Sequence, residues 1–412
     1  MVAEICDREH RGKPLLAYEA ACAMLAREVQ PLTRPAEAIP LREALGRLLA
    51  VSLGLDRDEP PLPRSAMDGF AVRSADGMAQ RQIVATIHAG TEAVAELAAG
   101  KAMAVMTGGT VPPGADCVIP IERTRREGDF LILLDPQQNL RHVRRVAEIG
   151  ARGRMVLESG SRLRPGELAI AASVGADPIF VRPSVRAAVL STGDEVVPWA
   201  STPLPHQVRD GNRLGVCARL LELGAEVVHD AHLPDDFQAL ERGIQAALEC
   251  SDLVITIGGV SMGEKDLLPA VFAQLGVRTL LHGVALQPGK PLWVGSRGSQ
   301  WILGLPGNPL SAFTVTELFA RPMLRLLEGA QESMPLEALF PGVAGMPMQS
   351  GGRDLWLPAQ LVAQMHGAPR LHAAPWNGSG DWSTLAGARA LWFLPAGARA
   401  EAGDAVRYLP LD

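Results

Sequence analysis

Three Gly-rich segments decide the fold: SDLVITIGGVSMGEKD (residues 251–266), LQPGKP (286–291) and LGLPGNPLSA (303–312). The first begins with a short, β-branched apolar run, Leu253 to Ile257, which predicts a buried strand that ends at a Gly pair. A helical pattern then runs from Leu267 to Leu275. A glycine turn between a strand and a helix presents free N–H groups and the positive end of the helix dipole to an anion. We therefore expect an anion site here, with the other two segments as loops along the same sheet edge.

The segments before residue 251 alternate between strands and helices. Residues 185–190 and 225–233 have strand patterns, and residues 212–223 and 237–248 have apolar positions at helical spacing. This alternation predicts a doubly wound α/β domain whose mostly parallel sheet is covered on both faces. Ligands bind such sheets beyond the carboxyl ends of the strands. The motif STGDEVV (191–197) and the Gly-rich segments are expected at those ends.

The composition limits the class of protein. A chain of 412 residues is too long for one typical core and predicts several domains. The net charge of −6 argues against broad nucleic-acid binding, which needs clustered positive charge. No apolar run approaches the roughly 20 residues of a membrane span, and the N-terminus shows no signal peptide. The five scattered cysteines include no C-x-x-C pair, which indicates thiols in a reducing, cytoplasmic compartment.

Changes in pattern along the chain predict the domain boundaries. Prolines at 60, 61 and 63 mark an exposed loop, and residues 70–134 cluster or alternate apolar side chains between Gly/Pro turns, as in an all-β domain. After residue 330 the helical pattern gives way to short strand candidates. We expect a discontinuous N-terminal domain (1–56 and 140–183), an inserted β domain (57–139), the α/β domain (184–328) and a C-terminal β-barrel or sandwich (329–412).

Acidic side chains stand at the predicted strand ends. Asp210 precedes a helix and either caps it or accepts from a ligand hydroxyl or a metal. Asp266 likewise either favours its helix N-terminus through the dipole or binds a ligand. Two carboxylates beside loops suited to phosphate are typical of a Mg²⁺ site, because Mg²⁺ takes one or two carboxylates with phosphate oxygens and waters. We predict Asp210 and Asp266 as metal ligands, with Glu195 as a third acid at the same edge.

One cation and several small polar groups complete the candidate set. Lys290 is fixed between Gly289 and Pro291, which favours contact with a phosphate or oxyanion over a solvated position. No Ser-His-Asp or Cys-His constellation is readable and the histidines show no metal spacing, so positioning of an anionic ligand with a metal is favoured over nucleophilic catalysis. Thr107, Ser261 and Ser311 either offer hydroxyls to an anion or only stabilise a turn or helix cap. Asp68 is a further candidate that could equally form only an Asx turn before Gly69, and its spacing does not decide between the two.

The motifs together resemble the molybdopterin molybdenumtransferases, the MoeA-type proteins of molybdenum cofactor synthesis, and the E domain of gephyrin. One such string is weak evidence, but seven in the family's order are specific. They are SAMDGFAV (65–72), MTGGTVPPGADCVI (106–119), STGDEVV (191–197), DGNRLGV (210–216), GGVSMGEKD (258–266), PGKP (288–291) and GLPGNPLSA (304–312).

The resemblance implies a reaction. Adenylylated molybdopterin and molybdate would give molybdenum cofactor and AMP with Mg²⁺. Asp210 and Asp266 would hold the nucleotide-pterin and the metal, Glu195 would contact the same ligand, and Lys290 would contact phosphate or molybdate. The groups that the resemblance places on the bound ligand are Gly258, Gly259, Ser261, Gly289, Pro306, Gly307, Asn308 and Ser311.

The resemblance also implies partners. It predicts a homodimer whose active sites lie between the α/β domain of one subunit and the inserted β domain of the other, so that Asp68 and Thr107 would come from the partner subunit. A molybdopterin adenylyltransferase and apo-molybdoenzymes are further expected partners, and neither nucleic acid nor a membrane is expected.

Two positions depart from the family pattern. Many members carry a G-E-D segment where this chain has Val146-Ala147-Glu148-Ile149-Gly150, which keeps the Glu but lacks the Gly and the Asp. Many also carry Lys where this chain has Gln287. These changes leave open a weaker or tungstate-tuned paralogue, or a non-catalytic scaffold. A nucleotide hydrolase on the same α/β domain, of the competence-damage type, shares the GDE and Gly-pair motifs but not SAMDG or the inserted domain.

Overall fold

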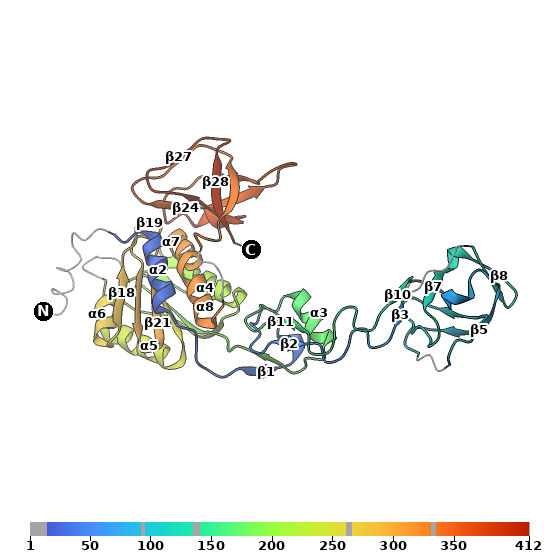
Figure 1. Ribbon diagram of the computed structural model, residues 1–412. Helices are drawn as coiled ribbons and strands as arrows, with labels where there is room; N and C mark the ends of the chain where they lie inside the picture. The colour runs from blue at the N-terminus through green and yellow to red at the C-terminus, as the bar shows by residue number, and fades with distance from the viewer. Residues whose placement is uncertain (1–14, 92–94, 135–140, 261–265, 331–334, 412) are drawn as a thin grey trace. The chain divides into compact units, whose positions relative to one another are not determined.

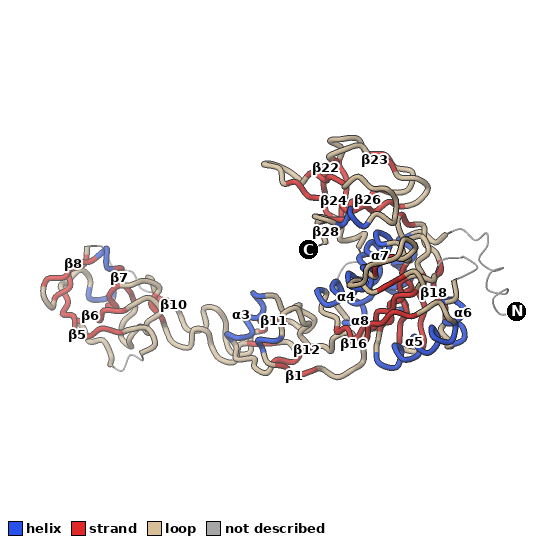
Figure 2. Tube along the Cα trace, turned by 180° about the vertical axis from the view of Figure 1, so that it is seen from behind, coloured by secondary structure: helices blue, strands red, loops and turns tan. Residues whose placement is uncertain are grey.

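The computed structural model describes residues 15–91, 95–134, 141–260, 266–330 and 335–411. The chain divides into two compact units. The larger unit holds residues 1–38, 46–50 and 180–412, and the smaller unit holds residues 39–45 and 51–179. Residues 1–38 thus group with the α/β region, while the domain boundaries given above stay a prediction. Figures 1 and 2 show the elements of both units from opposite sides.

A six-stranded mixed sheet forms the centre of the larger unit, in the order β16-β13-β17-β21-β20-β18. The first four strands are parallel, and β20 runs antiparallel to both of its neighbours. The bounds are β13 (Arg186–Thr192), β16 (Glu226–Leu233), β17 (Leu253–Ile257), β18 (Arg278–His282), β20 (Trp293–Arg297) and β21 (Gln300–Leu305).

Helices cover both faces of this sheet. Strand residues alternate between the two faces, so Ile255 of β17 packs in a cluster with Leu220 of α4, while Val254 packs in a second cluster with Ile244 of α5. The predicted doubly wound α/β architecture is confirmed. The helices of this layer are α2 (Tyr18–Glu28), α4 (Gly211–Glu222), α5 (Phe237–Cys250), α6 (Leu268–Gln274), α7 (Pro309–Val315), the π-helical turn η4 (Thr316–Ala320) and α8 (Arg321–Glu328).

The C-terminal region forms a closed five-stranded barrel, coloured orange to red in Figure 1. Its ring runs β24-β25-β22-β28-β26 and closes through the pairing of β24 with β26. A short strand, β19 (Leu286–Gln287), joins the α/β region to β24. The bounds are β22 (Phe340–Ala344), β24 (Asp354–Val362), β25 (Arg370–Ala373), β26 (Ala390–Leu394) and β28 (Ala405–Pro410).

Side chains alternate between the two faces of the barrel strands, and one face packs against the α/β region. Leu355 and Trp392 lie in the barrel's own core. Trp356 faces the other way, into the cluster that covers the central sheet, and its ring centroid lies 5.5 Å from that of Tyr18 on α2. The barrel and the α/β region therefore share one apolar core. Aromatic rings at this distance attract one another, which stabilises the contact between the two regions.

The smaller unit contains the all-β region that the sequence predicts. Its sheet has the order β7-β4-β6-β5-β9-β8. The bounds are β4 (Gly69–Val72), β5 (Arg81–Ile87), β6 (Lys101–Val105), β7 (Cys117–Pro120), β8 (Thr124–Glu127) and β9 (Phe130–Leu133). The same unit also holds β2 (Leu53–Gly54), β3 (Arg64–Ser65), β10 (Val143–Arg144), β11 (Met155–Leu157) and α3 (Pro165–Ser173).

Short elements complete the chain. They are β1 (Glu37–Ile39), β12 (Ile179–Val181), β14 (Val196–Val197), β15 (Val208–Arg209), β23 (Met348–Gln349), β27 (Arg399–Ala400) and the 3₁₀ turns η1 (Leu41–Glu43), η2 (Ser74–Asp76), η3 (Ile121–Arg123) and η5 (Trp382–Leu385). Among the described residues, no helix combines the length and apolar character that crossing a membrane requires.

Ala147 occupies a backbone conformation suited to glycine, with φ at 58°. It is the position at which many family members carry the Gly of G-E-D. The turn is held by hydrogen bonds, since the Ala147 N–H donates to Pro60 O over 3.0 Å and the Ile149 N–H donates to Glu59 O over 2.9 Å. These hydrogen bonds therefore hold an alanine in a backbone conformation that favours glycine.

We expect Ala147→Gly to stabilise the smaller unit by about 0.5–1 kcal/mol. Relief of roughly 1–2 kcal/mol of left-handed strain outweighs the roughly 0.5–1 kcal/mol cost of the freedom that glycine gains in the unfolded chain. The measurement is the urea dependence of hydrogen exchange in peptides covering residues 143–160. Ala151→Gly, at an exposed position outside the left-handed region, is the control. A faster exchange in Ala147→Gly than in the parent would contradict the strain argument.

Candidate functional site

The carboxyl ends of three neighbouring parallel strands form the candidate site. β13, β17 and β21 lie side by side in the sheet. They lead into residues 193–195, the glycine pair 258–259 and the turn 306–308. The sheet thus brings two of the Gly-rich segments and the STGDEVV motif to one edge.

Gly258 lets these turns approach one another. Its N–H donates to Leu305 O over 3.0 Å. Its φ is 94°, and a Cβ added to it would lie 2.9 Å from Thr192 Oγ1. A Cβ added to Gly307 would in turn lie 3.5 Å from the Gly258 Cα. The turns are therefore in contact, and at position 258 only glycine fits both the space and the backbone conformation.

Asp210 is the N-cap of α4. Its Oδ1 accepts from the Arg213 N–H over 3.2 Å, and its Oδ2 accepts from Ser191 Oγ and Arg213 Nε, both over 2.7 Å. Its exposed fraction is only 4%. Of the two interpretations left open by the sequence, the structure shows the capping role, and the carboxylate is held by three protein donors.

Arg213 fixes this end of α4 from several sides. Besides Asp210, its guanidinium contacts Asp230 Oδ2 at 2.5 Å and lies 5.2 Å from the centroid of the Trp199 ring. A buried carboxylate needs such a partner, because an unpaired charge is costly to bury. Arg213 is not among the residues predicted from the sequence, although it stands within the motif DGNRLGV.

A serine, a histidine and an aspartate do meet in the structure, although no such constellation was readable in the sequence. Ser191 Oγ lies 3.2 Å from His232 Nδ1 and 2.7 Å from Asp210 Oδ2. The single hydroxyl proton goes to the carboxylate, so His232 donates to Ser191. This direction orients Asp210 and leaves Ser191, which is 2% exposed, unactivated as a nucleophile. Nucleophilic catalysis stays disfavoured.

Asp266 lies just before α6, half-buried, at the end of the segment that follows β17. Ser261, another candidate, falls outside the described residues. Within the described ranges, no group of three His, Cys, Asp or Glu side chains is arranged to hold a metal ion. A Mg²⁺ ion held here by one carboxylate would therefore need ligand phosphate oxygens and waters to complete its shell, which is how proteins commonly bind it.

The Glu195 side chain folds back over Gly193, in the turn that follows β13. Its carboxylate oxygens lie 2.8 and 2.9 Å from the position of a Cβ on Gly193, which has φ 125°. The neighbouring Asp194 accepts from the Asp235 N–H over 3.1 Å. Burial, followed by the charge of Asp194, raises the pKa of Asp235 above its usual value. This edge of the sheet is therefore acidic.

Lys290 is exposed at the end of LQPGKP, and among the described residues its ammonium group forms no ion pair. Gln287, where the resemblance leads us to expect a lysine, lies in β19 beside Leu355 of the barrel. The barrel also places Arg353 here, whose guanidinium donates to Leu286 O over 3.1 Å. A cation missed by the sequence analysis therefore lies next to the position of the missing lysine.

The turn 306–308 is held from two sides. Asn212 of α4 donates to Gly307 O over 2.7 Å. Asn308 donates to Ser379 Oγ of the barrel region over 2.9 Å, and the Leu310 N–H donates to Ser379 O over 3.0 Å. Ser311 lies 4% exposed in α7 directly after this turn. The barrel thus takes part in shaping the predicted anion loop, and no local signal in the sequence indicated Ser379.

In the smaller unit, the structure brings Asp68 and Thr107 together. Asp68 Oδ1 accepts from the Thr107 N–H over 2.6 Å and from Thr107 Oγ1 over 2.8 Å. These two hydrogen bonds, the backbone one first, lower the pKa of Asp68 below its usual value. Two candidates that are 39 residues apart in the chain therefore form one exposed anionic group.

Comparison with known proteins agrees with these motifs. Residues 16–175 match the family described as the MoeA N-terminal region (domain I and II), and residues 188–326 match the family described as a probable molybdopterin binding domain. The molybdopterin molybdenumtransferase of Synechococcus elongatus is 36% identical over 75% of this chain and 80% of its own length. That of Bacillus subtilis is 30% identical over 90% and 89%.

Solved structures match the fold over nearly the whole chain. The molybdopterin biosynthesis MoeA protein from Pyrococcus horikoshii has a TM-score of 0.81 and 25% identity, and the match covers 96% of this chain and 100% of that chain. Another solved structure, also described as a molybdopterin biosynthesis MoeA protein from this organism, has a TM-score of 0.78 and 26% identity, and the match covers 97% of this chain and 100% of that chain.

We expect Thr107→Val to raise the pKa of Asp68 toward its usual value, because one of the two hydrogen bonds to the carboxylate is lost. A lowered folded pKa contributes stability above the unfolded pKa, and this contribution is lost as the pH falls through the folded pKa. The variant should therefore lose less stability on acidification. Side-chain carboxyl NMR titration measures the shift, with Thr91→Val as the control. An unchanged Asp68 titration would show that the hydroxyl does not support the carboxylate.

Proposed function

The chain belongs to the molybdopterin molybdenumtransferase family, and on that premise we propose that it joins molybdate to adenylylated molybdopterin with release of AMP, with Mg²⁺ as cofactor. The observation that carries the proposal is the set of touching turns at one sheet edge, joined by Gly258, together with the exposed Lys290 of LQPGKP. A phosphoanhydride and molybdate are both anions, so bringing them together requires N–H groups and cations that offset their repulsion.

Each group in this edge has a defined task in the proposal. The backbone N–H groups of Gly259, Gly307 and Asn308 bind phosphate oxygens, and Lys290 and Arg353 hold the oxyanion. Mg²⁺ bound at this edge would neutralise phosphate charge and polarise the phosphoanhydride. Of the two predicted metal ligands, Asp266 is the first choice, because Asp210 already accepts from three protein donors.

We further propose a homodimer in which Asp68 and Thr107 of one subunit complete the site on the α/β domain of the other. The support is that the candidates lie on two compact units, and that several apolar side chains of the smaller unit are exposed in a single chain. They are Leu45, Val51, Leu62, Met155 and Ile170. A cytoplasmic location, a molybdopterin adenylyltransferase and apo-molybdoenzymes as partners belong to the same proposal.

One observation favours a second candidate, a weaker or tungstate-tuned paralogue. Ile149 is 54% exposed at the position where many relatives carry an aspartate, so an apolar group has replaced a carboxylate on the surface. Replacement of molybdate by tungstate in the assay below distinguishes this candidate, as does binding of the nucleotide-pterin without turnover.

We expect purified protein with adenylylated molybdopterin, Mg²⁺ and molybdate to release AMP and to activate a cofactor-free molybdoenzyme. Asp266→Ala should lower the rate by roughly 100-fold or more, since an electrostatic contact to the reacting phosphate is lost. Asp129→Ala, at an exposed turn, is the control. AMP release at the same rate without molybdate would instead indicate a nucleotide hydrolase.

We expect Arg353→Met to raise the KM for molybdate about tenfold, the effect of losing one charge-assisted hydrogen bond of roughly 1.5 kcal/mol. Arg370→Met, an exposed arginine on β25 of the same barrel, should leave the KM unchanged. Steady-state AMP release at varied molybdate concentration measures both. An unchanged KM in Arg353→Met would remove Arg353 from the proposed oxyanion group.

A further inference from the structure

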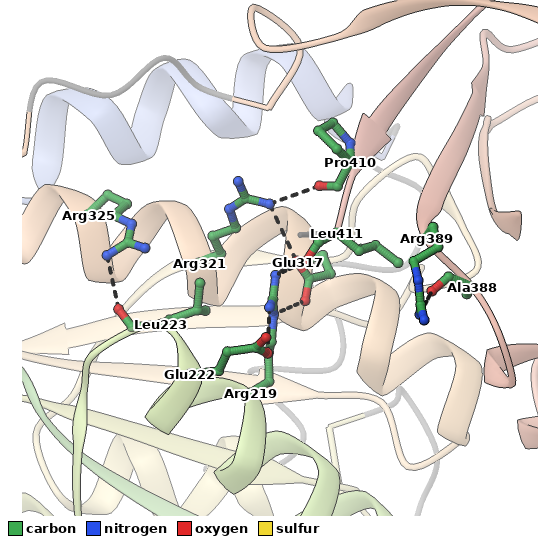
Figure 3. A network of polar contacts seen from close by, with 10 residues as sticks. All are labelled: Arg219, Glu222, Leu223, Glu317, Arg321, Arg325, Ala388, Arg389, Pro410 and Leu411. Atoms are coloured by element: carbon green, nitrogen blue, oxygen red, sulfur yellow. Dashed lines mark hydrogen bonds and ion pairs between the residues drawn. The ribbon is translucent and has the colours of Figure 1, made fainter. Parts of the chain in front are cut away.

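A buried pair of charges lies behind the candidate site (Figure 3). Arg219 Nε donates to Glu317 Oε1 over 2.7 Å, and a second guanidinium nitrogen of Arg219 donates to Oε2 over 3.0 Å. Glu317 is fully buried, and the Arg219 side chain is 13% exposed. Two parallel N–H···O bonds between a guanidinium and a carboxylate fix the orientation of both partners as well as their distance.

The pair joins three segments that are far apart in the chain. Arg219 lies on α4, and Glu317 lies on the π-helical turn η4 between α7 and α8. Arg219 also donates to Leu411 O over 2.8 Å, and Arg321 donates to Pro410 O over 3.1 Å. The end of the barrel's last strand is therefore hydrogen-bonded to the same charged group as the two helices.

The same two helices shape the anion loop. α4 begins at its cap Asp210, and α7 begins directly after the turn 306–308. Asn212 joins them at the site through its 2.7 Å hydrogen bond to Gly307 O. About two helical turns, or roughly 10 Å, farther along α4, Arg219 binds Glu317 of η4, which directly continues α7. Two polar contacts therefore connect α4 to the segment 307–317: Asn212 to Gly307 at the site, and Arg219 to Glu317 farther from it.

A buried ion pair such as Arg219–Glu317 is better suited to orienting the segments that carry it than to raising the free energy of unfolding. Burying two charges costs much of what their attraction returns, so an apolar pair of similar volume would often be as stable. Burial opposes the charge of Arg219, but hydrogen bonds to Glu317 and Glu222 outweigh it and raise the Arg219 pKa. A π turn is a rare, less favourable form of helix that occurs often at functional sites, and Glu317 lies within one.

We propose that Arg219 and Glu317 are positioning residues for the anion loop 306–308: they hold α7 against α4 and the barrel's last strand, so that the loop stays set for the oxyanion. The readout on molybdate rests on the proposed function, whereas the readout on exchange of loop amides does not. Loss of either charge releases α7 from α4 behind the site, although every group predicted to touch a ligand remains.

The experiment compares Glu317→Gln, Arg219→Met and Arg219→Lys with the parent protein, at a temperature well below unfolding. Hydrogen exchange is measured in peptides covering residues 303–316, and AMP release gives the KM for molybdate and kcat. We expect Glu317→Gln and Arg219→Met to speed exchange in this segment roughly tenfold and to raise the KM roughly tenfold with a smaller change in kcat. Arg219→Lys keeps the positive charge but cannot form the two parallel hydrogen bonds to Glu317. It should therefore restore only part of the slow exchange and only part of the low KM.

Arg399→Met, which removes an exposed ion pair of the barrel with Glu401, is the matched control and should change neither readout. Glu317→Gln keeps the shape of the side chain, so it decides the matter if Arg219→Met fails to fold. A lower melting temperature with unchanged exchange at 303–316 and an unchanged KM would overturn the proposal and leave a purely structural pair. If the parent protein does not turn over, the proposed function fails, and the exchange measurement still decides the role of the pair.

Discussion

The close approach of Gly258 to Thr192 and to the turn at Gly307 is the constraint on which the site depends. Parallel pairing brings the ends of β13, β17 and β21 to one edge, as it does in any sheet of this kind. In this chain the connections after those strands also touch one another. They are therefore rich in glycine, proline and small polar residues, which allow backbones to approach one another closely.

The barrel is part of this arrangement and more than an appended domain. It shares an apolar core with the α/β region through Trp356, it supplies Arg353 beside Gln287, and it holds the anion loop through Ser379. Its last strand also reaches the Arg219–Glu317 pair. A shift of the barrel relative to the α/β sheet would therefore displace the turn 306–308. This contact gives a physical reason for the barrel in a protein whose chemistry is expected at the edge of the α/β sheet.

The sequence was sufficient for features with a local signal. The strand at Leu253–Ile257, its glycine turn and the alternation around it depend on short-range pattern, and the fold class that they predict is confirmed. Asp210 was left open between cap and ligand, because both uses place an acid before a helix, and the structure shows the cap. Closure of the barrel through β24 and β26 was not predictable, since strand patterns do not specify pairing.

Residues whose partners lie far away in the sequence could not be predicted from the sequence. Ser191 and His232 are neighbours only because β13 and β16 pair in register, and nothing in their spacing indicates it. Arg353, Ser379 and the Arg219–Glu317 pair meet their partners over long separations in sequence. Asp68 and Thr107 were both proposed from their motifs, yet the hydrogen bonds between them follow from the packing of the smaller unit rather than from either motif.

The most direct test of the account is a crystal structure of the protein with adenylylated molybdopterin, Mg²⁺ and molybdate. We expect phosphate oxygens within hydrogen-bonding distance of the N–H groups at Gly259 and Gly307, with the oxyanion beside Lys290 and Arg353. Electron density for the nucleotide-pterin elsewhere in the larger unit, with these turns unchanged and without ligand, would contradict it.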